Sequence, residues 1–167
     1  MYFHLHDLDA FGIEAERALS LNPNNADVLA WSGLFWTYGH IADPDERAHG
    51  VALVKKAMTL NPMYPSWYHF PVGWHYWNAG ELEKALDEAK KIDLPGYFYT
   101  HLLLATVYGA MNRQEEGHAA AARLLELYPN FPRSIRSELY KWNQPDPVID
   151  KVIRDLRRAG MDIPPGT

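Results

Sequence analysis

Prolines recur along this chain at a nearly constant interval, and that period limits the folds it can adopt. The spacing is 39, 33 and 34 residues between Pro23, Pro62, Pro95 and Pro129. Three of them follow helix-forming segments of one kind, which read ALSLN (18–22), AMTLN (57–61) and LLELY (124–128). Because proline lacks the amide hydrogen that a helix interior needs, each marks a helix end and a restart. The chain therefore repeats one helical unit.

The clearest copy of this unit is residues 99–129, which contain two helical runs joined at residues 111–114. Small residues recur on the inner faces of the two runs, at Ala105, Gly117 and Ala121. Small side chains let two helix backbones approach closely. This spacing predicts an antiparallel helix pair.

The unit resembles the tetratricopeptide repeat, a pair of helices of about 34 residues with the pattern W-x2-L-G-x2-Y followed by a closing proline. Leu104, Tyr108 and Pro129 match that pattern, Ala105 replaces its glycine, and His101 replaces its tryptophan. The resemblance implies an all-α, right-handed superhelical solenoid of antiparallel helix pairs. It also implies a concave face that binds peptides or protein segments.

The period predicts one domain, residues 1–167. Its expected parts are a partial repeat (1–25), full repeats (26–62, 65–95 and 98–131), a C-terminal helical cap (132–160) and a frayed tail (161–167). Residues 40–46 are expected to form a loop before a helix over 46–60. Pro71 is expected to bend or restart the first helix of its repeat. Asp146 is expected to be the N-cap of the last helix, and Gly160 its stop.

Residues 1–25 match only part of a repeat, which predicts that the chain is a fragment of a larger protein; the alternative is a genuine start with a degenerate cap. The segment PSWYHFP (65–71), then Ala85-Leu86, residues 133–138 and LRRAGM (156–161) resemble the carboxy-terminal repeats of bacterial adenylate/guanylate-cyclase-like proteins. Such proteins carry a cyclase or a winged-helix DNA-binding domain upstream. The resemblance implies a bacterial signalling context and no activity in this segment, because no cyclase catalytic residue is present.

Aromatic residues give the best candidate binding surface. In the helical phase of the repeat, the concave groove is expected to contain Leu34, Tyr38, Trp67, Phe70, Trp74, Trp77, Tyr99 and Leu102. Trp67, Phe70, Trp74 and Trp77 recur at i, i+3, i+7 and i+10 and so form one stripe. Large aromatic side chains are common anchors of protein interfaces. The stripe predicts a site for a peptide or protein segment, and the alternative is that it belongs to the core.

Two other functions fit the same sequence. An aromatic groove predicts a domain that senses a peptide or small molecule and shifts its helix packing on binding. The incomplete first repeat leaves apolar surface at the amino-terminal face, which predicts self-association as a homodimer.

Composition and motifs argue against several other classes. A net charge of −5 argues against nucleic-acid and anionic-membrane binding, and the chain contains no cysteine and no apolar run of membrane-helix length. Its eight histidines do not have a metal-ligand spacing such as HExxH. No nucleophile elbow or phosphate-binding loop is present. We therefore expect no enzyme activity, no metal and no cofactor in this segment, and a cytoplasmic location.

Overall fold

The computed structural model describes residues 6–166 of the chain, and over these residues it contains helices and no strands. Residues 1–5 of the predicted partial repeat and residue 167 of the predicted tail lie outside the described range. The helices are α1 (Leu8–Leu21), α2 (Ala26–Gly39), α3 (Pro44–Leu60), the 3-10 helix η2 (Ser66–Tyr68), α4 (His69–Ala79), α5 (Leu82–Lys90), α6 (Phe98–Ala110), α7 (Gln114–Leu127), α8 (Phe131–Tyr140) and α9 (Asp146–Arg158). The predicted all-α fold is confirmed.

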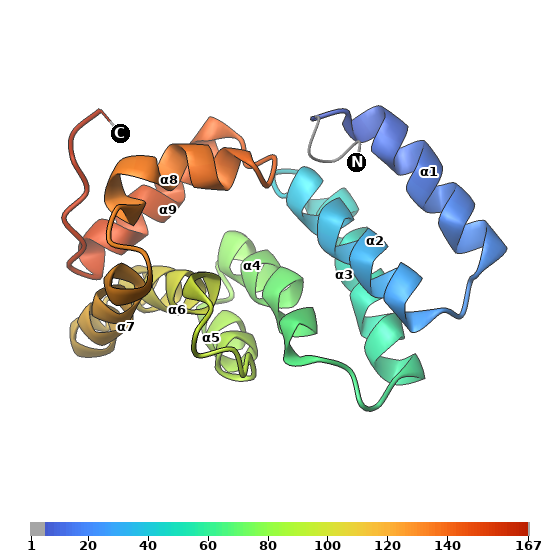
Figure 1. The fold of residues 1–167 in the computed structure, drawn as a ribbon, viewed down its shortest axis with the longest axis horizontal. Helices are drawn as coiled ribbons and strands as arrows, with labels where there is room; N and C mark the ends of the chain where they lie inside the picture. The colour runs from blue at the N-terminus through green and yellow to red at the C-terminus, as the bar shows by residue number, and fades with distance from the viewer. Residues whose placement is uncertain (1–5, 167) are drawn as a thin grey trace.

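Neighbouring helices pack as antiparallel pairs, α2 with α3, α4 with α5 and α6 with α7 (Figure 1). The first pair approaches most closely at two glycines. A Cβ atom added to Gly33 would lie 2.5 Å from the carbonyl oxygen of Gly50, so neither helix tolerates a side chain at this crossing. Ala105, Gly117 and Ala121, predicted at close contacts, are all buried. Small residues therefore set the spacing of the helices.

The helix ends follow from local sequence. The loop before α3 is shorter than the predicted loop over residues 40–46. The Asp43 carboxylate accepts hydrogen bonds from the amides of Asp45 and Glu46, so α3 begins at Pro44, two residues earlier than predicted. Proline is favoured at this first helical position because its missing amide has no partner there. The predicted turn at 111–114 falls between α6 and α7, where Asn112 adopts φ 55°.

Pro71 does not bend a helix. Residues 66–68 form the separate turn η2, and α4 begins at His69, so Pro71 lies in the first turn of α4. The first amides of a helix have no partner within the helix, and proline costs nothing there. Of the two predicted outcomes, a bend or a restart, the structure shows the restart, which comes at His69, two residues before Pro71.

The C-terminal end differs from the prediction in two details. Helix α9 begins at Asp146, so Asp146 lies in its first turn and Pro145 is the N-cap. Gly160 ends the helix as predicted, with φ 82°, and the amide of Met161 donates to the carbonyl of Leu156 at 3.0 Å. That turn folds the tail back onto the helix, as is typical of this C-terminal motif. Met161 and Ile163 are consequently buried, which corrects the prediction that the tail is frayed from residue 161.

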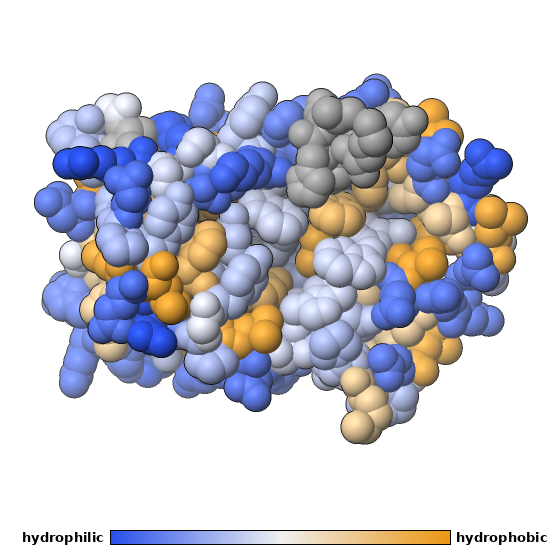
Figure 2. Space-filling model, viewed as in Figure 1, coloured by the Kyte–Doolittle hydropathy of each residue, from blue (hydrophilic) through white to orange (hydrophobic). Residues whose placement is uncertain are grey.

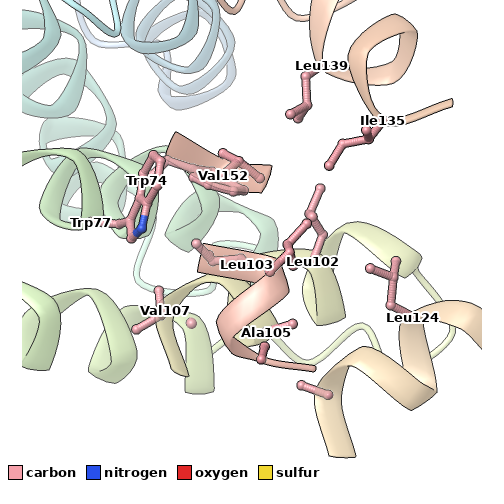
Figure 3. Packing of buried hydrophobic residues seen from close by; sticks show 14 of the residues in the cluster. Trp74, Trp77, Leu102, Leu103, Ala105, Val107, Leu124, Ile135, Leu139 and Val152 are labelled. Atoms are coloured by element: carbon pink, nitrogen blue, oxygen red, sulfur yellow. The ribbon is translucent and has the colours of Figure 1, made fainter. Parts of the chain in front are cut away.

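Most of the core lies in one large cluster that runs from α4 to α9 and includes residues of α2. Figure 3 shows part of it, where α4, α6, α8 and α9 bring their apolar side chains together. A second cluster lies between α2, α3 and the start of α4. The last two helices thus share one core with the repeats.

Candidate functional site

A cavity of about 240 Å³ lies between α2, α4 and α6, the first helices of the three pairs, and residues 131–158, which comprise α8, α9 and the loop between them. We call the cavity the central cavity, and we call residues 131–158 the C-terminal segment. Its lining is Trp31, Leu34, Tyr38, Trp67, Phe70, Trp74, Tyr97, Tyr99, Leu139, Trp142, Gln144 and Val152. The lining comes from α2, η2, α4, α6, α8, α9 and the loops beside them. Figure 2 shows pale side chains, the colour that tryptophan and tyrosine take on this scale, across the middle of the face, with orange patches on both sides of them.

Six of the eight residues predicted from the sequence line this cavity. They are Leu34, Tyr38, Trp67, Phe70, Trp74 and Tyr99. Trp74 lies beside Val152 of α9 in Figure 3, so the predicted stripe meets the C-terminal segment here. That these residues bind a partner stays a prediction.

Trp77 and Leu102 do not line the cavity, because both side chains have 0% exposure. Helix α9 covers this end of the stripe. The indole Nε1 of Trp77 donates to Asp155 Oδ2 at 3.1 Å, and Lys151 Nζ lies 4.1 Å from the centre of its ring. Trp77 is therefore core, as in the alternative reading of the stripe, while Trp67, Phe70 and Trp74 reach the cavity.

The C-terminal segment closes the far wall of the cavity. Trp142 Nε1 donates to the Tyr99 hydroxyl at 2.7 Å, and its ring lies edge-on to Tyr38 with centroids 5.4 Å apart. Gln144 Nε2 donates to the carbonyl oxygen of Tyr38 at 3.2 Å. These contacts join α8 and its loop to both α6 and α2. In Figure 1, α8 runs from above α6 toward the end of α2.

The opening of the cavity has two partly exposed aromatic residues. Trp31 is 48% exposed and Tyr97 is 41% exposed. The Trp31 ring lies 4.5 Å from the Trp67 ring, and the Tyr97 ring lies 5.9 Å from that of Phe70. Exposed aromatic surface at the mouth of an apolar cavity favours contact with another molecule over purely internal packing.

The lining contains no residue that is charged at neutral pH, and its main polar groups are tyrosine hydroxyls. Burial, and then the proximity of Tyr97 and Tyr99, raises the pKa of Tyr38 well above its ordinary value. Burial also raises the pKa of Tyr99, whose hydroxyl is bonded to Trp142 and Glu138. The hydroxyls therefore stay neutral, and the chemistry offered by the lining is binding of apolar and hydrogen-bonding groups.

Sequence reasoning missed six lining residues: Trp31, Tyr97, Leu139, Trp142, Gln144 and Val152. Trp31 and Tyr97 precede Leu34 and Tyr99 by three and two residues, so an aromatic search around the predicted positions would have found them. The other four belong to the C-terminal segment. Their apolar spacing was visible in the sequence, but nothing in it indicated which surface they cover.

Comparison with solved structures identifies the fold. Two crystal structures of MamA are similar to this chain. The first has a TM-score of 0.60 at 21% identity over 92% of this chain and 86% of MamA; the second has a TM-score of 0.57 at 20% identity over 87% and 76%. The chain therefore has a tetratricopeptide-like solenoid fold. No family model matches the chain, and no curated protein matches it. The resemblance to cyclase-associated repeats therefore stays a prediction from sequence.

Proposed function

We propose that this chain is a non-catalytic protein-interaction module whose central cavity receives an apolar anchor side chain from a partner. The partner is a separate protein or another domain of the same parent protein. The observation that carries the proposal is the open-mouthed aromatic cavity on the side where the first helices of the pairs meet. Aromatic-lined pockets that exclude water are where interface energy concentrates.

The size of the cavity limits what can enter it. An engineered apolar cavity of about 150 Å³ is large enough for benzene, so a cavity of about 240 Å³ holds one ring-bearing side chain. Leu139 of α8 and the loop residues Trp142 and Gln144 form one wall of this space. The partner therefore inserts one side chain into the cavity, and the adjoining part of its segment contacts Trp31 and Tyr97.

Trp31→Ala is expected to weaken partner binding by at least about 30-fold, which corresponds to about 2 kcal/mol for an aromatic hot spot. The experiment selects binding peptides from a random library on the immobilised chain and measures their affinities by calorimetry. Because Trp31 is half exposed, the loss of folding stability should be about 1 kcal/mol. Met63→Ala is the matched control, since Met63 is 90% exposed and does not line the cavity. Selected peptides that bind Trp31→Ala and Met63→Ala equally well, or that share no aromatic residue, contradict the proposal.

We further propose that the module belongs to a larger bacterial signalling protein and acts in the cytoplasm. This proposal rests on the sequence resemblance. Among residues 6–166, no helix is both long and apolar enough to cross a bilayer. The gene sequence upstream tests the parentage: a cyclase or winged-helix domain there supports it, and an unrelated domain contradicts it.

Self-association through α1 is a second candidate. Ile13 is 67% exposed and Leu21 is 70% exposed on this helix. If a second copy covers this face, Ile13→Glu should abolish any rise of molar mass with concentration in light scattering, because it places a charge in the interface. A mass that stays monomeric in the unmodified chain at all concentrations rules the homodimer out.

A further inference from the structure

Tyr38 brings a polar group, its hydroxyl, into the otherwise largely apolar central cavity. Tyr38 is only 8% exposed, and its hydroxyl makes no hydrogen bond to any residue between 6 and 166. Its backbone carbonyl, in contrast, accepts from Gln144. Among residues 6–166, every side-chain nitrogen or oxygen that is fully buried has a hydrogen-bond partner, so the Tyr38 hydroxyl, which has none, is open to the cavity. The Tyr38 hydroxyl therefore has an unused hydrogen-bonding capacity inside the cavity.

The surroundings define what can use that capacity. The hydroxyls of Tyr97 and Tyr99 lie near enough to Tyr38 to interact electrostatically with it. Tyr99 is already engaged by Trp142 and Glu138, whereas the half-exposed Tyr97 is at the mouth. The Tyr38 hydroxyl is thus the polar group of the cavity interior that a ligand can bind. A neutral tyrosine hydroxyl can either donate or accept a hydrogen bond.

Charge and shape restrict the ligand further. No Lys, Arg, His, Asp or Glu lines the cavity, so a charged group would enter without compensation for its lost hydration. The walls carry the rings of Trp67, Phe70, Trp74 and Trp142, which favour a flat partner through offset or edge-on contacts. A neutral planar molecule satisfies both conditions.

We propose that the central cavity is a binding site for a small neutral aromatic molecule with one hydrogen-bonding substituent, such as a phenol, whose polar group bonds to the Tyr38 hydroxyl. This inference shares with the proposed function the premise that the cavity is a binding site. It adds a ligand that competes with the partner's anchor side chain for the same space. The module would then release its partner when the molecule is present.

The test uses the full chain with phenol, toluene and benzoate as probes, measured by isothermal titration calorimetry. Phenol should bind more tightly than toluene, and benzoate should bind most weakly. Tyr38→Phe should weaken phenol binding about five-fold, the size expected for one neutral hydrogen bond, and leave toluene binding unchanged. Tyr64→Phe is the matched control, because Tyr64 stacks on Tyr68 and does not line the cavity.

Two results overturn the inference. One is phenol that binds no more tightly than toluene to the unmodified chain, and the other is equal phenol affinity in Tyr38→Phe and Tyr64→Phe. A melting temperature for each variant shows that it is folded. Peptide binding that depends on Trp31, found together with no phenol binding, refutes the ligand and leaves the proposed function standing. Phenol binding without any peptide binding refutes the proposed function and leaves the ligand inference standing.

Discussion

Replacing Trp77 with alanine should lower the free energy of unfolding by about 3–5 kcal/mol, the range for removing a fully buried tryptophan. The side chain has no exposed surface, and its indole packs edge-on against Trp74 with centroids 5.3 Å apart. The substitution also removes the hydrogen bond to Asp155, whose side chain is buried. Urea unfolding followed by circular dichroism measures the loss.

Trp31→Ala is the control for this prediction, since it removes the same side chain at an exposed position. The two variants should separate stability from binding: Trp77→Ala unfolds more easily, and Trp31→Ala binds less tightly. Equal losses of stability in the two variants would mean that α9 does not cover Trp77, and the closure of the cavity by the C-terminal segment would then be wrong.

Gly109→Ala should cost about 1–3 kcal/mol or more, as is typical of overpacking in a close helix contact. A Cβ atom at Gly109 would lie 1.8 Å from the carbonyl oxygen of Asp155 and 2.8 Å from its carbonyl carbon. Both atoms belong to the backbone of α9, so no side chain can rotate away to make room. The substitution should force α9 away from α6, which lowers the melting temperature.

Gly96→Ala is the matched control for Gly109→Ala. A Cβ atom at Gly96 meets nothing within 4 Å, and its backbone is not in the left-handed region. The control should leave the melting temperature nearly unchanged. A Gly109→Ala variant as stable as Gly96→Ala would contradict the contact between α6 and α9.

The helix pairs were predictable from the sequence because their determinants are local. Proline at a helix boundary, small residues at crossings and the apolar spacing within each run all act within about 34 residues. The turn at residues 111–114 and the helix stop at Gly160 are examples that the structure confirms. Six of the proposed site residues lie in the cavity for the same reason, since the helical phase of each repeat fixes which side chains face inward.

The closure of the groove was not predictable, because it depends on contacts between residues far apart in the chain. Gln144 contacts Tyr38, and Asp155 contacts Trp77. A stripe of apolar residues on α9 predicts that the helix is covered on one side, but the stripe does not indicate which surface covers it. This is why Trp77 was assigned to the groove, and why Trp142 and Val152 were missed. The restart predicted near Pro71 is present, but the 3-10 turn η2 places it at His69.

The most direct test of the central cavity is a crystal structure of the chain with the tightest peptide from the library selection. We predict an aromatic side chain of the peptide inside the cavity, in contact with Trp67, Phe70 and Trp74, and the adjoining peptide backbone against Trp31 and Tyr97. A peptide bound instead to the outer helices α3, α5 or α7, with the cavity unchanged, would contradict the account.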